Sequence, residues 1–281
     1  MYIKVRGADF SNVKIGTMAL ELSELTKEAI EASGNNSMTD SQKRALDDFL
    51  MGIQGEIFNS IEYLILPFIA NSVNKAFVNY KNNTDYGGMD LYELYEGGIR
   101  ISSQSETKTV KRIANTASLK TNNIFAITAT KGKGSSIALD LSFMPSSYPQ
   151  LTISTNGSGS DRVNKTASIM DSADISAKLQ MDYSEALPLD EIVTYGLLSK
   201  DGYLKTFNSD GKLKETTFSG EMDFDSTCYL NILPSVAYNG TIKSGIATHT
   251  LYATIIGNGI DDTNMSKLMD SLKTLIQAFV E

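Results

Sequence analysis

The spacing of hydrophobic positions is helical in one early part of the chain. Thr39 and Gln42, three residues apart, form a capping box, in which each side chain satisfies the other's free backbone N–H at the start of a helix. The apolar residues that follow recur at helical spacing, on one face. They are Ala45, Leu46, Phe49, Leu50, Ile53 and Ile57. The pattern predicts an amphipathic helix that begins after Thr39 and packs by this face.

The helical pattern weakens further along. Gly52 and Gly55 both disfavour helix, so we expect a break at this point. A second short segment, Asn59–Leu66, ends before a proline. We therefore predict a helical segment over residues 38–75, and a separate segment for anchoring or assembly over residues 1–37.

From about residue 76 to 256 the pattern changes to short runs rich in β-branched and aromatic residues, separated by clusters of Gly, Asn, Ser and Asp. This pattern is typical of a β-sandwich. The runs are Ile124–Thr130, Ser136–Phe143, Leu151–Thr155, Ile192–Leu198, Tyr203–Phe207, Lys212–Phe218 and Thr250–Ile256. The clearest hairpin is Gly202–Phe218, where Asp210 and Gly211 tolerate the positive φ that a tight turn demands.

A strongly one-sided helical pattern closes the chain. Its apolar residues are Met265, Leu268, Met269, Leu272, Leu275, Ile276 and Phe279. Asp262 is expected to cap this helix, which runs from about Thr263 to Val280. The pattern as a whole predicts a mainly β protein: a β-sandwich over residues 76–281 with an N-terminal helical segment and a C-terminal helix.

Composition and charge argue against several classes of protein. The 281 residues carry a formal net charge of −8, and the densest basic cluster, Lys108–Arg112, is short, so we expect no nucleic-acid binding. The longest apolar stretch, Tyr63–Ala70, is too short to span a membrane. Met1–Gly7 carries charges and lacks the apolar run of a signal peptide. Cys228 is the only cysteine, which excludes an intrachain disulfide and fits synthesis in a reducing cytoplasm.

Several segments, taken in their order and spacing, resemble one family of proteins. These segments are Thr39–Arg44 with the helix after it, Ile61–Phe68, Gly202–Gly211 and Leu251–Thr263. Together they are similar to the concanavalin A-like, laminin-G-type jelly-roll sandwiches of structural proteins from phages that infect gut Bacteroidales. The resemblance covers about residues 37–281. The chain departs from the family in having no Trp, and in Ile69–Ser72, where the family has a Gly-Gly segment.

The resemblance implies a jelly-roll fold and a non-enzymatic role in the virion, as a fibre or decoration component of the head or tail. It also implies a homo-oligomer, above all a trimer, that contacts other virion proteins. Loops on a rigid sandwich could in addition hold host-surface glycans, although a purely architectural role stays open. The alternatives are a non-phage carbohydrate-binding lectin module and, less favoured, a glycan hydrolase.

Three acidic residues at alternate positions, Glu221, Asp223 and Asp225, would share one face of an extended strand. Certain glucanases of this fold class carry the motif Glu-x-Asp-x-x-Glu, which this segment resembles. Here, however, the last acidic residue comes one position early and is Asp instead of Glu. The same oxygens could bind Ca²⁺, and acidic residues on a strand also serve simply to keep an edge soluble. We therefore predict no catalytic residues and no required cofactor, with these three residues as the candidate calcium site.

The other residues with reactive side chains have ordinary explanations. His249 is the only histidine and no Gly-x-Ser-x-Gly motif accompanies it, so we expect a strand-edge or loop histidine. Cys228 lies beside Tyr229 and is expected to be a small buried residue. Lys131–Ser136 lacks the spacing of a phosphate-binding loop and is predicted to be a turn. Asn156–Asp161 is predicted to be a flexible contact loop.

Three tyrosines mark the entry to the predicted sandwich. Tyr86, Tyr92 and Tyr95 lie among paired glycines, where the chain is expected to form a loop-rich rim. Tyrosine rings at such a rim can stack on sugars, so these residues are the candidate ligand-binding site. Core packing or subunit contact is the alternative use of the same rings.

Overall fold

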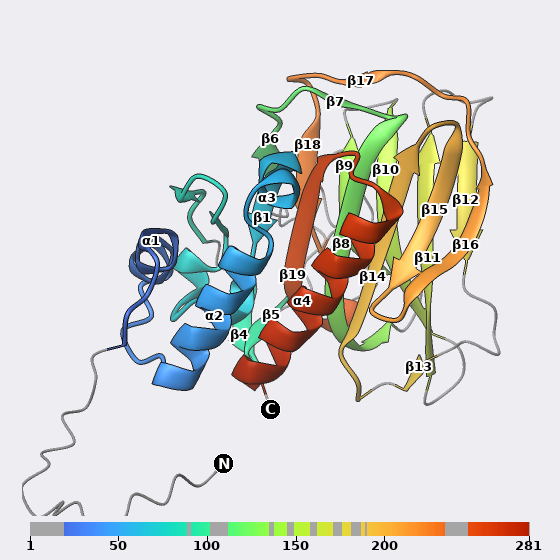
Figure 1. The fold of residues 1–281 in the computed structure, drawn as a ribbon. Coiled ribbons are helices and arrows are strands. Elements are labelled where there is room, and N and C mark those ends of the chain that lie inside the picture. The colour runs from blue at the N-terminus through green and yellow to red at the C-terminus, as the bar shows by residue number, and fades with distance from the viewer. Residues whose placement is uncertain are drawn as a thin grey trace, which may run out of the picture.

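Two antiparallel β-sheets face each other in this protein, and helices cover the outer face of the larger sheet (Figure 1). The computed structural model describes residues 20–88, 91–101, 112–134, 138–144, 149–157, 162–170, 176–180, 187–188, 190–233 and 247–280. The mainly β fold and the two helical ends agree with the prediction from the sequence.

The larger sheet contains ten of the described strands. Eight of them follow the order β16-β15-β14-β8-β19-β1-β2-β3, while β5 pairs with β19 and with β4. Their bounds are Ile61–Ile65 (β1), Val78–Asn79 (β2), Thr84–Asp85 (β3), Tyr92–Tyr95 (β4), Gly98–Ile101 (β5), Asn123–Gly134 (β8), Val193–Lys200 (β14), Tyr203–Asn208 (β15), Gly211–Thr217 (β16) and Ala247–Asn258 (β19). The C-terminal strand β19 thus pairs with both β8 and β1 at the centre of the sheet.

The smaller sheet contains seven described strands in the order β12-β11-β10-β9-β18-β6, with β13 also paired to β11. Their bounds are Arg112–Ala114 (β6), Ala138–Met144 (β9), Gln150–Gly157 (β10), Arg162–Met170 (β11), Ser176–Gln180 (β12), Leu187–Pro188 (β13) and Tyr229–Ile232 (β18). A short pair, Leu119–Lys120 (β7) and Asp223–Phe224 (β17), lies at one end of the sandwich (Figure 1).

Apolar side chains form two layers, one on each face of the larger sheet. The first layer fills the space between the sheets and includes Ile124, Phe143 and Tyr195. The second lies between the larger sheet and the helices and includes Phe125 and Met269. Because the central strands are buried on both faces, their sequences are nearly continuous apolar runs and show little alternation.

Four α-helices complete the fold. They are Glu24–Ser33 (α1), Asp40–Gly52 (α2), Glu56–Ser60 (α3) and Asp262–Val280 (α4), and two 3₁₀ turns are Pro67–Ile69 (η1) and Val73–Lys75 (η2). The predicted capping box of Thr39 and Gln42 is present in α2, and the predicted break separates α2 from α3. Figure 1 shows α2 and α4 lying over the larger sheet, with their apolar faces in the second layer.

The structure corrects three predictions about these elements. The segment 38–75 is not helical throughout, because β1 lies inside it and pairs with β19. The cap of α4 is Asp261, whose Oδ1 accepts a 2.6 Å hydrogen bond from the backbone N–H of Asn264, and Asp262 is the first helical residue. Residues 1–37 are not wholly a separate segment, because α1 packs on α2, while residues 1–19 lie outside the described part.

The seven predicted strands are confirmed within a few residues where the structure describes them, and so is the hairpin. Asn208 pairs with Gly211, and Gly211 has a φ of 125°. Lys131–Ser136 is not a turn over its first four residues, because residues 131–134 continue β8 and pair with β19. Of Asn156–Asp161, residues 156–157 belong to β10 and the rest lie outside the described residues. The described helices include none long and apolar enough to cross a membrane.

Candidate functional site

A straight row of polar side chains crosses the outer face of the smaller sheet. Leu141 and Phe143 on β9 belong to the layer between the sheets, so Ser142 between them points outward. Asn231 on β18 points outward for the same reason. Each member of the row is the register partner of the next. The members, from β6 to β12, are Arg112, Asn231, Ser142, Thr152, Ser168 and Lys178. We call this set the outer-face row.

Hydrogen bonds join neighbouring members of the row. The Asn231 amide donates to Ser142 Oγ at 3.1 Å, and Thr152 Oγ1 and Ser168 Oγ are 2.6 Å apart. Asn231 Oδ1 is buried and accepts no hydrogen bond from any described residue. Buried polar atoms are nearly always partnered, so this oxygen is available to a donor that the described residues do not supply.

The row changes from buried to exposed along its length. Asn231 and Ser142 are buried, Thr152 and Ser168 are half-buried, and the two ends are exposed. At one end the Arg112 guanidinium carbon lies 4.0 Å from the ring centroid of Tyr229, which is close enough for a cation–π contact. The row therefore combines hydroxyl and amide groups with a stacked aromatic ring, the two kinds of group that hold sugars.

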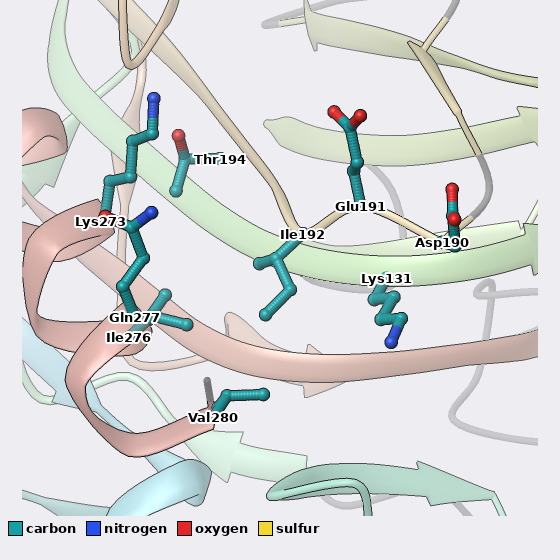
Figure 2. A pocket seen from close by; sticks show the side chains of 9 residues that line it. All are labelled: Lys131, Asp190, Glu191, Ile192, Thr194, Lys273, Ile276, Gln277 and Val280. Carbon is teal, nitrogen blue, oxygen red and sulfur yellow. The ribbon is translucent and has the colours of Figure 1, made fainter.

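A cleft lies on the other side of the molecule, beside α4 (Figure 2). Its volume is about 380 Å³. Its lining residues are Lys131, Asp190, Glu191, Ile192, Thr194, Lys273, Ile276, Gln277 and Val280. Figure 2 shows Lys273 and Gln277 on the helix side and Asp190 and Glu191 on the opposite side. We call it the α4 cleft.

Charges of opposite sign line the α4 cleft. Lys131 Nζ lies 3.1 Å from a carboxylate oxygen of Glu96 just beyond it, and this contact lowers the pKa of Glu96 below its ordinary value. Asp190 and Glu191 are exposed on the wall that faces Lys273. The cleft is thus a second polar concavity, with an apolar floor that includes Ile276.

The structure does not bring the three predicted tyrosines together. Tyr92 is buried between the sheets, and its hydroxyl donates a 2.8 Å hydrogen bond to the carbonyl oxygen of Ile232. Tyr86 is half-buried against the same layer. Tyr95 is exposed and carries the Arg100 guanidinium 3.5 Å from its ring centroid. The three rings therefore do not form one exposed rim on which a sugar could stack. Tyr92 serves in core packing, which is the alternative that the sequence left open.

The three predicted metal ligands are exposed, and two of them share one lysine while the third contacts a threonine. Glu221 and Asp223 lie 3.6 and 3.8 Å from Lys120 Nζ. Asp225 accepts hydrogen bonds from the Thr227 side chain and backbone, which lower the pKa of its carboxyl group. Among the described residues, no three His, Cys, Asp or Glu side chains are grouped so that they could hold a metal ion. The calcium site therefore finds no support in this arrangement.

The prediction of a strand-edge or loop position for His249 is wrong, because the residue is fully buried near the start of β19, where it pairs with Gly132 of β8. Its Nε2 lies 2.9 Å from Oδ1 of Asp140, although the ring is not aligned for a hydrogen bond. Asp140 also forms a 2.7 Å ion pair with Lys165 Nζ, and all three side chains are buried. We call these three residues the interior charge cluster. The sequence offered one signal of it, since Asp140 is a charged residue within an apolar strand.

The cluster lies between the sheets, and one irregularity in β9 makes it possible. The register between β9 and β10 shifts at Asp140, so this residue is a β-bulge and points inward together with Leu141. Burial alone would raise the pKa of Asp140, but the charges of Lys165 and His249 bring it down to about 2. Burial lowers the pKa of the Lys165 amine.

Cys228 is buried, as predicted, and is a free thiol. Burial raises its pKa to about 11. A thiol held protonated in this way is a poor nucleophile, which fits a packing role.

These sheets and helices define the fold: a mainly β, concanavalin A-like jelly-roll sandwich with an N-terminal and a C-terminal helical part. Neither a protein-family model nor a curated protein sequence matches the chain. Solved structures match by fold. Domain 4 of AbnA, a GH43 extracellular arabinanase from Geobacillus stearothermophilus solved with arabinotriose, has a TM-score of 0.52 and 10% identity, over 75% of this chain and 98% of that domain.

Two further structures match this chain by fold and cover a smaller share of their own chains. A mutant of HCR/D has a TM-score of 0.50 and 13% identity, over 76% of this chain and 52% of its own. The tailspike protein 2 of bacteriophage CBA120 has a TM-score of 0.40 and 14% identity, over 62% of this chain and 27% of its own. At these identities the matches describe the fold alone, and the tailspike match is too weak to bear on a phage origin.

Proposed function

We propose that this chain is a non-catalytic, lectin-like module that binds a glycan along the outer-face row. The observation that carries the proposal is the row of polar side chains that share one register across six strands, with the half-exposed hydroxyls of Thr152 and Ser168 at its middle. Such hydroxyls can donate to and accept from the hydroxyl groups of a sugar.

The dimensions of the row suit an oligosaccharide. Six neighbouring strands at a spacing of about 4.8 Å give a row about 24 Å long, which is the length of a short chain of sugar units. Thr152 and Ser168 offer half-exposed hydroxyls in the middle of this length, and Tyr229 offers a ring near one end. The AbnA domain of similar fold was solved with arabinotriose, which makes short glycans the first ligands to try.

The placement of the charged residues supports binding without catalysis. Glycoside hydrolysis needs two carboxyl groups on either side of one bond. Glu221 and Asp223 instead flank Lys120, and Asp225 contacts Thr227. The interior charge cluster contains the only histidine but is closed to a substrate by its burial.

We further propose that the module works in a bacteriophage particle, as a fibre or decoration component that contacts other virion proteins and forms a homo-oligomer, a trimer in the first instance. The ordered resemblance of Thr39–Arg44, Ile61–Phe68 and Leu251–Thr263 to phage sandwich proteins supports this assignment. A lectin module of a bacterial cell would use the same row, so the binding proposal does not depend on the phage proposal.

Glycan binding can be tested with the purified full chain on an array of bacterial and plant glycans, followed by calorimetry with the best ligand. The paired variant Thr152→Val, Ser168→Ala removes two hydroxyls at nearly constant volume. At about 0.5–1.5 kcal/mol for each of two lost hydrogen bonds, we expect affinity to fall by about fivefold to 150-fold.

The matched control is Lys273→Ala with Asp190→Ala in the α4 cleft, which should leave affinity unchanged. Loss of binding in this control with retention in the row variant would move the site to the cleft. A wild-type chain that binds no glycan would overturn the lectin proposal. Release of reducing ends from the same glycans, abolished by Glu221→Gln, would establish the hydrolase in its place.

A further inference from the structure

The interior charge cluster holds a primary amine against a carboxyl group in a dry space. Lys165 Nζ on β11 lies 2.7 Å from Asp140 Oδ2 on β9, and both side chains are at most 1% exposed. Lys165 Nζ also bonds to the hydroxyls of Thr130 and Thr155, the latter at 2.6 Å. These contacts hold the nitrogen beside the Asp140 carboxyl group.

We propose that Lys165 and Asp140 form an intramolecular amide bond, which cross-links β9 to β11. The amine of Lys165 and the carboxyl group of Asp140 are held side by side, because both are buried and both are hydrogen-bonded to Thr155. Fixing two reacting groups in this way replaces a bimolecular encounter with a unimolecular step, which accounts for a large part of the barrier to such a reaction.

The reaction begins from the ion pair and needs no other reagent. One proton passes along the existing hydrogen bond from the ammonium to the carboxylate, which leaves a neutral amine and a carboxylic acid. Removing two charges from a buried space offsets the cost of this transfer, since desolvation disfavours the charged form of both groups. The lone pair on Nζ then attacks Cγ of Asp140 and gives a tetrahedral intermediate.

The intermediate loses water. The C–O bond to one Asp140 oxygen breaks, and that oxygen leaves as water after it receives the proton that Nζ gives up. One C–N bond forms, one C–O bond breaks and one water molecule is released, with no change in oxidation state. The product is a neutral amide in a space that excludes bulk water, so hydrolysis back to the acid and amine is opposed.

His249 and Thr155 are placed to assist this step. Thr155 Oγ1 donates a 2.7 Å hydrogen bond to Asp140 Oδ1, where negative charge develops during the attack. His249 Nε2 lies 2.9 Å from the same oxygen, and a small rotation of the ring would align it. We assign His249 Nε2, together with Thr155 Oγ1, as a hydrogen-bond donor that stabilises the negative charge on Oδ1 while Oδ2, which faces the amine, departs as water.

The cross-link can be detected in the wild-type chain by intact mass under denaturing conditions, which should be lower than the sequence mass by one water molecule. Trypsin then gives a decisive map, because it cleaves at Arg162, between the two linked residues. The amide should prevent cleavage after Lys165, so residues 163–178 should remain whole and joined to residues 134–162 as one branched peptide.

Three variants distinguish a true Lys165–Asp140 amide from water lost in the mass spectrometer. Lys165→Met lacks the amine and should show the full sequence mass, which also controls for water lost in the mass spectrometer. Asp140→Asn should release ammonia and yield a product of the same mass as cross-linked wild type. His249→Phe removes the donor beside Oδ1 and should form the amide about 100-fold more slowly, seen as unreacted chain that converts during incubation.

The wild-type map decides the question even if a variant fails to fold. Full sequence mass together with cleavage after Lys165 would overturn the proposal, and the cluster would then be a buried ion pair alone. A mass deficit that maps to residues other than Asp140 and Lys165 would overturn it as well. A His249→Phe chain that cross-links as fast as wild type would remove His249 from the mechanism.

Discussion

Gly257 on β19 leaves no room for a side chain. A Cβ at this position would clash with the backbone carbonyl oxygen of Ser60 and lie 2.7 Å from the Phe125 ring. The clash with Ser60 involves backbone, which cannot rotate away. The close approach of β1 and β19 at the centre of the sheet therefore depends on a glycine here.

We expect Gly257→Ala to lower the free energy of unfolding by about 1–3 kcal/mol, because overpacking forces backbone and side chains to shift. Urea denaturation followed by circular dichroism would measure it. Gly52→Ala at the end of α2 is the matched control: nothing lies within 4 Å of the added Cβ, so the change should stabilise the protein by about 0.5–1 kcal/mol. Equal effects at the two positions would contradict the packing described for β19.

Single residues also show how much chemistry the sequence could reveal. The capping box of Thr39 and Gln42 was predictable because its spacing is local. The burial of His249 was not, because it depends on Asp140 and Lys165 in strands of the opposite sheet. Asn231 and Ser168 are ordinary polar residues, and only the register of the strands aligns them in the outer-face row.

At the scale of elements, one carboxylate attaches α1 to α2. Asp47 Oδ1 accepts hydrogen bonds from the backbone N–H of Ser23 at 2.9 Å, the Ser23 hydroxyl at 2.6 Å and the Thr26 hydroxyl at 2.7 Å. Ser23 is also the N-cap of α1. Ser23 therefore both caps the start of α1 and attaches this helix to Asp47 of α2.

We expect Asp47→Ala to cost about 1.5–2 kcal/mol, the lower part of the range for hydrogen bonds to a charged group, because Asp47 is half-exposed. Hydrogen exchange should increase in Glu24–Ser33 and stay unchanged in the central strands. Asp48→Ala, an exposed neighbour on the same helix, is the control. Equal protection of α1 in both variants would show that Asp47 does not hold it.

The same attachment should respond to pH. Partial burial would raise the pKa of Asp47, but the hydrogen bonds from Ser23 and Thr26 bring it below the ordinary value of 3.8. Because the folded-state pKa is the lower one, this contribution is present above pH 3.8 and is lost as the pH falls below it. Protection factors in α1, which correct for the intrinsic pH dependence of exchange, should therefore fall at acidic pH in the wild type, and Asp47→Ala should already show the lower protection near neutrality.

Elements differed in how far the sequence could predict them. The strands with β-branched runs between turn residues were found, since both signals are local. The strand β1 was assigned to a helical segment because Ile61–Leu66 is apolar on both faces, and periodicity cannot distinguish a buried strand from a buried helix turn. Its true state depends on pairing with β19, almost at the other end of the chain.

At the scale of the whole molecule, the two outer faces of the sandwich differ. Helices α2 and α4 cover the larger sheet, whereas the outer-face row crosses the smaller one (Figure 1). In a particle, the helix-covered side would then serve attachment and the row would face outward. This arrangement follows from the proposed function and is tested together with it.

Immunogold electron microscopy of purified phage particles, with antibody to this chain, should label one consistent location and so distinguish head from tail. Mass spectrometry of the same particles should find peptides of the chain. Light scattering of the purified protein should give a mass three times that of the single chain. Unlabelled particles that also lack its peptides would contradict the phage assignment, while the glycan measurements would still stand on their own.

The central position of β19 has a consequence for the order in which the protein can fold. Strand β8 lies between β14 and β19, and β19 in turn pairs with β1. As the ribosome makes the chain, β1 and β8 emerge long before residues 247–258. Until β19 is made, each of the two strands has an apolar edge without its partner strand. The sheet can close only after residues 247–258 have been made, and such long-range pairing is slow. The nascent chain should therefore depend on chaperones, and its yield should be sensitive to the rate of translation.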